Sequence, residues 1–255
     1  MFPTAEAAMT ETRIAVGESL AQPTPRAPGH IDLAPSATRV QTREEIRLRI
    51  EEIGIVPTIR TSSAEDALFA VKTIARAGIP IIEVNANFPG AMGVVSHLAK
   101  HAPDVIVGAG SVLNANVAGR CWAEGAKFLS CDGLLPDVVD FAAKQNVLII
   151  SGALTPTEVI AAWNSGSDFV KVFPCDAVGG HTYIRSLKAA LPDARLIAAG
   201  GVTPLTALDF VLAGASALGI DKQTFPHEAI WLRQEGRIRE LARRFLSFVD
   251  RARNT

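Results

Sequence analysis

Short apolar runs alternate with amphipathic segments along most of this chain. The apolar runs are four to eight residues long and predict strands at 54–60, 79–86, 105–110, 128–131, 147–153, 169–174, 195–201 and 217–221. A turn rich in Gly, Pro, Asn, Asp or Ser follows each run, and then apolar residues recur at helical spacing. These helices are expected to start near Ala64, Gly90, Asn114, Leu135, Pro156, Gly180, Pro204 and His227. The strands are continuously apolar, which is typical of strands covered on both faces.

This order predicts an α/β protein in which a parallel sheet closes into a (β/α)8 barrel. A doubly wound open sheet is the alternative, but a dinucleotide-binding sheet needs a glycine-rich turn after its first strand, and PTIRTSSAED has none. A helix over 43–53 is expected to precede the first strand. Residues 1–42 are rich in Ala, Pro and Thr and predict a flexible N-terminal extension, which leaves 43–255 as the barrel domain.

Composition narrows the class of partner. The chain has 255 residues, 48% of them hydrophobic, and a net charge of -1, which favours neither a nucleic-acid nor an anionic-membrane partner. No apolar run reaches the ~20 residues of a membrane span, and the N-terminus lacks a signal-peptide pattern. Three cysteines without metal-like spacing predict reduced thiols, and we therefore expect a cytoplasmic protein.

Two charged residues interrupt otherwise apolar strands. Lys171 lies within SDFVKVFP, and Glu83 lies within IPIIEVNANFP. Burial favours the neutral form of an amine, and the neutral amine is the form that attacks a carbonyl carbon. If one barrel brings both residues together, Lys171 is a candidate imine-forming nucleophile and Glu83 a candidate proton shuttle. The alternative for Lys171 is a strand-end residue that extends to solvent.

Other polar residues and glycines gather at the carboxyl ends of the predicted strands, where barrel enzymes carry their chemistry. They are Arg60, Asn85, Asn87, Ser111, Phe173 beside Lys171, and Gly200 with Gly201. Strand alternation predicts that Glu83, Asn85 and Asn87 share one face. Turn chemistry is the alternative for the two asparagines, and an exposed strand-end charge is the alternative for Arg60.

These segments carry a family resemblance. EVNANFP, GAGSVLN, FVKVFP, GGHTYIRSLKAALP and AAGGVTP together resemble the 2-keto-3-deoxy-6-phosphogluconate and phosphogalactonate aldolases, over roughly residues 45 to 250. The resemblance implies a trimeric, cofactor-independent and metal-independent Schiff-base enzyme that releases pyruvate. It also implies that Lys171 forms the imine and Glu83 is the general acid/base. Arg60 and Ser111 would hold the pyruvyl carboxylate, Phe173 would pack on substrate, and Gly200 and Gly201 would meet its distal end.

One position distinguishes the two branches of the family, and the chain departs from the usual family pattern in three further places. Asn87 stands where the gluconate branch tends to have arginine, and resembles the galactonate branch. Asp132 and Ser151 stand where the family usually has prolines. Asp221 and Lys222 replace a Gly-Ser pair that donates to phosphate. We expect Asp221 and Lys222 to contact the distal end of the substrate, with a helix N-cap as the alternative for Asp221.

The sequence therefore predicts a class I aldolase that cleaves or forms a 2-keto-3-deoxy (phospho)sugar acid, giving pyruvate and an aldehyde such as glyceraldehyde 3-phosphate. Two alternatives stay open. One is an aldolase for a non-phosphorylated 4-hydroxy-2-keto acid of the 4-hydroxy-2-oxoglutarate type. The other is a non-catalytic barrel that binds a keto acid, although retention of both Glu83 and Lys171 argues against it.

Overall fold

Eight parallel strands close into a barrel in the computed structural model, which describes residues 41–221 and 225–254. The strands are β1 Ile55–Ile59, β2 Ile81–Asn85, β3 Ile106–Gly110, β4 Phe128–Ser130, β5 Leu148–Ala153, β6 Phe169–Val172, β7 Leu196–Ala199 and β8 Ala217–Ile220. Each strand pairs with the next along the chain, and β8 pairs with β1 in parallel. The predicted (β/α)8 barrel is confirmed, and closure excludes the open sheet.

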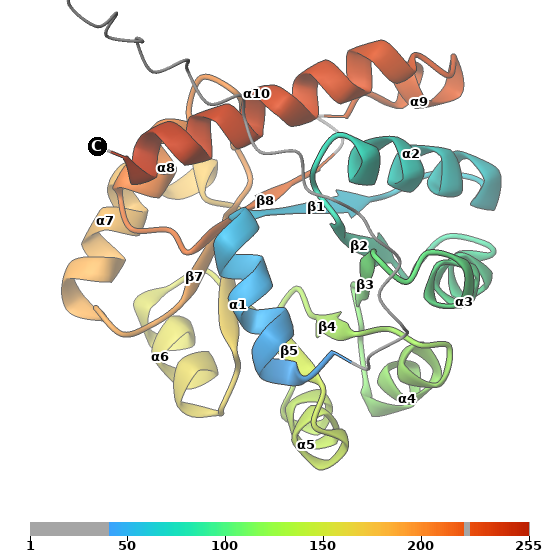
Figure 1. The fold of residues 1–255 in the computed structure, drawn as a ribbon. Coiled ribbons are helices and arrows are strands. Elements are labelled where there is room, and N and C mark those ends of the chain that lie inside the picture. The colour runs from blue at the N-terminus through green and yellow to red at the C-terminus, as the bar shows by residue number, and fades with distance from the viewer. Residues whose placement is uncertain (1–40, 222–224, 255) are drawn as a thin grey trace, which may run out of the picture. The chain divides into compact units, whose positions relative to one another are not determined.

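Helices surround the barrel (Figure 1). Their bounds are α1 Arg43–Ile53, α2 Ala64–Arg76, α3 Ala91–His101, α4 Ala115–Ala123, α5 Pro136–Gln145, α6 Pro156–Asn164, α7 His181–Ala190, α8 Ala207–Leu212, α9 His227–Trp231 and α10 Glu235–Arg253. A 3-10 turn, Asp176–Val178, lies between β6 and α7. The expected helix starts hold within one residue, except at α8, where a turn over 204–206 delays the start to Ala207.

The last predicted helix is divided in two. The sequence predicts one helix from His227, whereas α9 ends at Trp231 and α10 begins at Glu235. Arg233 between them adopts a left-handed φ of 52°, which breaks the helix. Its guanidinium pairs with Glu65 and Asp66 on α2, so a contact between segments distant in sequence accompanies the break.

Helix α1 packs against β1, β5 and β8, and lies across the barrel in Figure 1. Thr42 and Glu45 form a capping box at its start, as the sequence pattern favours. Its apolar face buries Ile46, Ile50 and Ile53, each burial contributing about 1.5–3 kcal/mol. The helix over 43–53 is thus confirmed. Helix α1 covers the barrel on the side where β6 begins. There Arg43 Nε lies 2.8 Å from Oδ1 of Asp168, the residue before β6.

Candidate active site

A small cavity opens at the carboxyl ends of the strands, where the sequence analysis expects the chemistry. Its volume is about 100 Å³. Apolar residues of β1, β5 and β7 form part of its wall, and its polar lining residues are Thr58, Arg60, Glu83, Asp132, Lys171 and Asp221. Phe173 and Gly200 also line it. Most of the predicted site residues are therefore brought to one place although they lie on different strands.

Lys171 points into this cavity from β6. It is 8% exposed, so it does not extend to bulk solvent as the alternative reading required. Its Nζ donates a hydrogen bond to Ser130 Oγ at 2.9 Å. Two carboxylates lie close to the same atom: Asp132 Oδ1 at 3.2 Å and Glu83 Oε1 at 3.8 Å. The convergence of Lys171 and Glu83 is thus found in the structure.

The charge of Lys171 differs from the expectation. Burial lowers the pKa of this ammonium, but the carboxylates of Glu83 and Asp132 outweigh burial, and the net pKa is raised. The free protein therefore holds Lys171 as an ammonium ion rather than a neutral amine. Sequence reasoning assigned the desolvation of Lys171 correctly but did not include the second carboxylate, which reaches the strand from a different loop.

Glu83 is buried in the barrel interior, with an exposed fraction of 3%. Thr58 Oγ1 donates a hydrogen bond to Glu83 Oε1 at 3.3 Å from the neighbouring strand β1. Gly110 on β3 provides the room for this side chain, because a Cβ built there would lie 2.1 Å from Glu83 Oε1. A larger residue at Gly110 would force the carboxylate to move.

Asp132 lines the cavity although its sequence position predicted no catalytic or binding role for it. It follows β4, and its side chain is 46% exposed. Burial raises the pKa of Asp132, but the Lys171 ammonium and a hydrogen bond from Ser111 lower it by a larger amount, so that the net pKa is lowered. The signal in the sequence was the aspartate itself, at a position where the resemblance implies proline. Its partners became visible only in the fold.

Ser111, Asn85 and Asp132 form a hydrogen-bonded chain beside Lys171. Ser111 Oγ donates to Asp132 Oδ2 at 2.8 Å, and Asn85 Nδ2 donates to Ser111 Oγ at 2.8 Å. Ser111 has a left-handed φ of 53°, a conformation that non-glycine residues adopt mainly at turns and functional sites. Ser111 is buried and reaches the cavity through Asp132 rather than lining it directly.

Asn87 lies apart from this chain of hydrogen bonds. It follows the end of β2, and its backbone N–H donates to Asn85 Oδ1 at 2.9 Å, which is the turn chemistry weighed as the alternative. It does not line the cavity described above. A role for Asn87 in substrate binding therefore stays a prediction, as do those of the other residues.

The structure describes the remaining predicted site residues in part. Arg60 is exposed and lines the cavity together with Gly200 and Asp221. Gly201 follows Gly200 and does not line the cavity itself. Lys222 lies outside the described residues. Ser151, the other departure from the family pattern, is buried on β5 and forms a 2.7 Å hydrogen bond with Ser167 Oγ. This bond accounts for Ser151 without a substrate.

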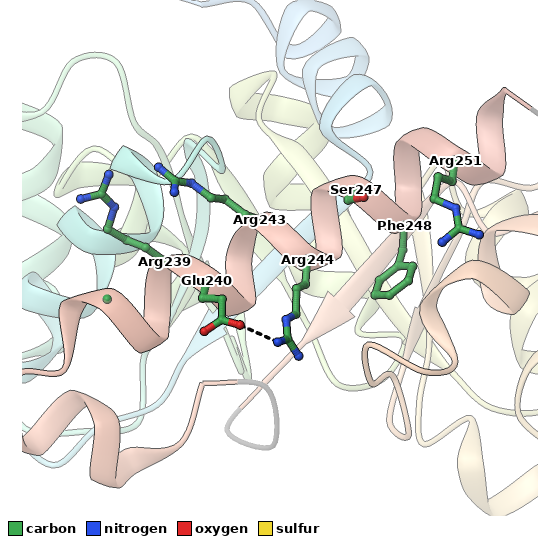
Figure 2. Close-up of a pocket in the computed structure, with 8 residues that line it drawn as sticks. Arg239, Glu240, Arg243, Arg244, Ser247, Phe248 and Arg251 are labelled. Atoms are coloured by element: carbon green, nitrogen blue, oxygen red, sulfur yellow. Dashed lines mark hydrogen bonds and ion pairs between the residues drawn. The ribbon is translucent and has the colours of Figure 1, made fainter. Parts of the chain in front are cut away.

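A larger hollow of about 640 Å³ lies along α10 and shares no lining residue with the first cavity (Figure 2). It is lined by Gly236, Arg239, Glu240, Arg243, Arg244, Ser247, Phe248 and Arg251. Arg244 pairs with Glu240 one turn away, and Arg239 with Glu235, as on an ordinary solvated helix face. Within the described part of the chain, no helix is long and apolar enough to cross a membrane. No cluster of three metal-ligating side chains occurs in the same residues.

Known proteins share both the sequence pattern and the fold. The model of the KDPG and KHG aldolase family matches residues 46–241. A 2-dehydro-3-deoxy-phosphogluconate aldolase from Pseudoalteromonas atlantica is 29% identical over 195 residues, covering 74% of this chain and 88% of that protein. The KHG/KDPG aldolase of Escherichia coli is 29% identical over 190 residues, covering 74% and 89%.

A galactonate relative and a solved structure extend this likeness. The probable 2-dehydro-3-deoxy-6-phosphogalactonate aldolase of Rhizobium meliloti is 27% identical over 71% of this chain and 86% of its own length. The KDPG aldolase of Legionella pneumophila, solved with pyruvate captured as a covalent carbinolamine, superposes with a TM-score of 0.72 at 24% identity, covering 77% of this chain and 96% of that one. The chain therefore belongs to the KDPG and KHG aldolase family, whose members are class I aldolases and hence carbon–carbon lyases.

Proposed function

We propose that this protein cleaves a 2-keto-3-deoxy sugar acid, phosphorylated or not, by forming an imine between Lys171 and the keto carbon, and that it releases pyruvate. The observation that carries this proposal is the position of Lys171 Nζ. It lies on the wall of a small cavity, between Glu83 Oε1 at 3.8 Å and Asp132 Oδ1 at 3.2 Å. An amine with adjacent proton acceptors is the arrangement that carbonyl chemistry by lysine requires.

The bonds change in a fixed order. Once deprotonated, Nζ attacks C2 of the keto acid and the C=O electron pair moves to oxygen, giving a carbinolamine. Loss of water leaves an iminium, which withdraws electrons from the chain. A base then takes the C4 hydroxyl proton, the C3–C4 bond breaks, and the aldehyde leaves while the electron pair forms an enamine. Protonation of C3 and hydrolysis of the imine release pyruvate and restore Lys171.

Glu83 is our candidate for these later proton transfers. It is buried beside Nζ, and its carboxylate has the Thr58 hydroxyl as a fixed hydrogen-bond donor. A positioned acid/base contributes typically ~10²–10⁴-fold to a rate. Because one group must both take and return protons, a position on the cavity wall 3.8 Å from the nucleophile suits this role.

The remaining contacts follow the family resemblance. Arg60 and Ser111 would hold the substrate carboxylate, Phe173 would pack on the carbon chain, and Gly200 with Gly201 would meet the distal end. Asp221 lines the same cavity and would contact the acceptor half of the substrate, together with Lys222. We assign no metal or organic cofactor, because the iminium supplies the electron withdrawal that this cleavage needs.

The oligomeric state, the cellular compartment and the domain boundary are also proposals. The family resemblance supports a homotrimer, which light scattering on the purified protein would test. A reducing cytoplasm agrees with the free, buried thiols of Cys121, Cys131 and Cys175. Residues 1–42 are proposed as an extension to the barrel domain 43–255, which limited proteolysis would test.

Neither alternative from the sequence is favoured over this proposal. A non-catalytic barrel would gain little from the buried Lys171–Glu83 pair, because the cost of desolvating two charges can exceed the attraction between them. Retention of the pair therefore favours a catalytic role. The 4-hydroxy-2-oxoglutarate type of substrate differs only in the acceptor half, so a panel of aldehydes separates it from a sugar acid.

The direct test is borohydride reduction with pyruvate. Mass spectrometry should find a reduced pyruvyl adduct on the peptide that contains Lys171, and Lys171→Ala should remove it. An exposed lysine, Lys144, provides the control, since Lys144→Ala should leave the adduct unchanged. An unmodified wild-type protein at saturating pyruvate would overturn the proposal.

A further inference from the structure

Asp132 already contacts two of the groups that a 2-keto acid would use, the Ser111 hydroxyl and the Lys171 amine. Its Oδ2 accepts the only hydroxyl proton of Ser111, and its Oδ1 lies 3.2 Å from Lys171 Nζ. Asn85 Nδ2 donates to the oxygen of that same hydroxyl at 2.8 Å. In the free protein the hydroxyl of Ser111 is therefore committed on both sides. A substrate carboxylate placed on Ser111 would meet the Asp132 carboxylate.

Two obstacles thus stand before the first chemical step. The ammonium of Lys171 has no lone pair with which to attack the keto carbon. In addition, two carboxylates side by side cannot both stay ionised without a large repulsion, and such pairs share a proton instead. Moving one proton from Lys171 to Asp132 removes both obstacles at once.

We propose that Asp132 is the base that takes this proton when the 2-keto acid binds, and that its neutral form then donates a hydrogen bond to the substrate carboxylate. An N–H bond of Lys171 breaks, an O–H bond forms on Asp132, and the charge of the site is unchanged. The amine pair freed on Nζ attacks C2. This role rests on the proposed function, because it needs the imine step.

The geometry favours Asp132 over Glu83 for this transfer. Asp132 Oδ1 is within hydrogen-bond distance of Nζ, whereas Glu83 Oε1 is 3.8 Å away. Glu83 then stays a carboxylate, which the later C4 hydroxyl step requires. The charged groups that line the cavity with Asp132 are Lys171, Glu83, Arg60 and Asp221, and the buried Cys131 thiol precedes Asp132 in the chain. Of these, Lys171 is the nearest acid whose proton must leave before reaction.

Asp132→Asn gives the decisive variant, because an asparagine resembles the neutral aspartic acid in shape and can donate to a carboxylate, yet it accepts no proton at neutral pH. The rate of adduct formation would be measured by rapid mixing and borohydride quench across pyruvate concentrations. We expect the maximal rate to fall about 10²-fold, while the half-saturating pyruvate concentration also falls. The variant's rate should rise about tenfold per pH unit, because the proton of Lys171 must now leave to solvent.

The sign of the change separates this role from a purely electrostatic one. If Asp132 only holds Lys171 in its charged form, its removal would release more neutral amine and the rate at pH 7 would rise. An unchanged or faster maximal rate therefore overturns the inference. Asp132→Glu should recover part of the rate, and Asp140→Asn, an exposed aspartate on α5, should match wild type.

Thermal unfolding of each variant shows that it is folded. The two proposals fail differently. No adduct in wild type sinks the aldolase assignment. An adduct that forms equally fast in wild type and Asp132→Asn sinks only the role of Asp132.

Discussion

Two parts of the barrel mouth differ in burial and in how closely they match the family pattern. Within β2 and β6, Glu83 and Lys171 are 3% and 8% exposed and agree with the pattern. At the ends of β4 and β8, Asp132 and Asp221 depart from it, and the side chain of Asp132 is 46% exposed. The two residues that match the pattern are thus fixed by packing, while Asp132 and Asp221 follow their strands, at positions that can change with less effect on the core.

Among these variants, Glu83→Gln, at the buried carboxylate, should cause the largest loss of turnover. We expect the pyruvyl adduct on Lys171 to form still, while turnover falls ~10²–10⁴-fold, because the amide keeps the shape but cannot carry protons. Borohydride trapping and steady-state cleavage would be measured on the same preparation. Full turnover would show that the buried carboxylate is dispensable and would break the comparison.

Gly110→Ala tests whether burial itself positions Glu83. A Cβ at this position would lie 2.1 Å from Glu83 Oε1, so the carboxylate must shift. A displacement of about 1 Å can lower a rate about 10²-fold, and overpacking typically costs about 1–3 kcal/mol of stability. Gly93→Ala is the matched control, because nothing lies within 4 Å of a Cβ there and helix α3 should gain about 0.5–1 kcal/mol. Equal activity of the two variants would contradict the prediction.

Asp221→Gly probes the exposed part. In the wild type, repulsion from Asp221 and attraction from Lys222 should leave similar kcat/KM values for phosphorylated and non-phosphorylated aldehydes. Removing the carboxylate should shift preference toward the phosphorylated one by about tenfold, or about 1.4 kcal/mol. Condensation of pyruvate with glyceraldehyde 3-phosphate, glyceraldehyde and glyoxylate measures this. A wild-type preference of about a hundredfold for the phosphorylated triose would show that Asp221 does not oppose phosphate.

The smallest effect concerns stability at alkaline pH. Because the pKa of Lys171 is raised in the folded protein, its ion pairs stabilise the fold fully below the ordinary lysine pKa of about 10.4. That contribution is lost as pH rises through the raised value. Urea unfolding of wild type and Lys171→Met from pH 8 to 11 should therefore show wild type losing stability more steeply above about pH 10.

Burial of Cys121 and Cys175 raises the pKa of each thiol to about 11. Ionisation of these thiols in the unfolded state therefore lowers the stability of wild type and of Lys171→Met alike over a similar alkaline pH range. The informative quantity is therefore the difference between the two curves. Parallel curves would mean that Lys171 gains no stabilising partner on folding.

Local patterns were sufficient for the elements that repeat. Each apolar run predicted a strand, and turn residues with capping signals placed every helix start except that of α8, because both depend on neighbours within a few residues. Where a distant contact decides, the prediction failed. The break between α9 and α10 at Arg233 is accompanied by its pairing with Glu65 and Asp66 on α2, about 170 residues earlier in the chain.

The sequence by itself determined the barrel, the family pattern and the choice of Lys171 and Glu83, because charged residues inside apolar strands are conspicuous and strand order sets which end they share. Only the tertiary structure decided the charge of Lys171 and the place of Asp132. A pKa depends on every charge within a few ångströms, and Asp132 lies 39 residues from Lys171 in sequence but 3.2 Å from it in space. Burial could be read from the strand itself, whereas the two carboxylates that together reverse its effect, Glu83 and Asp132, could be seen beside Lys171 only when the barrel closed.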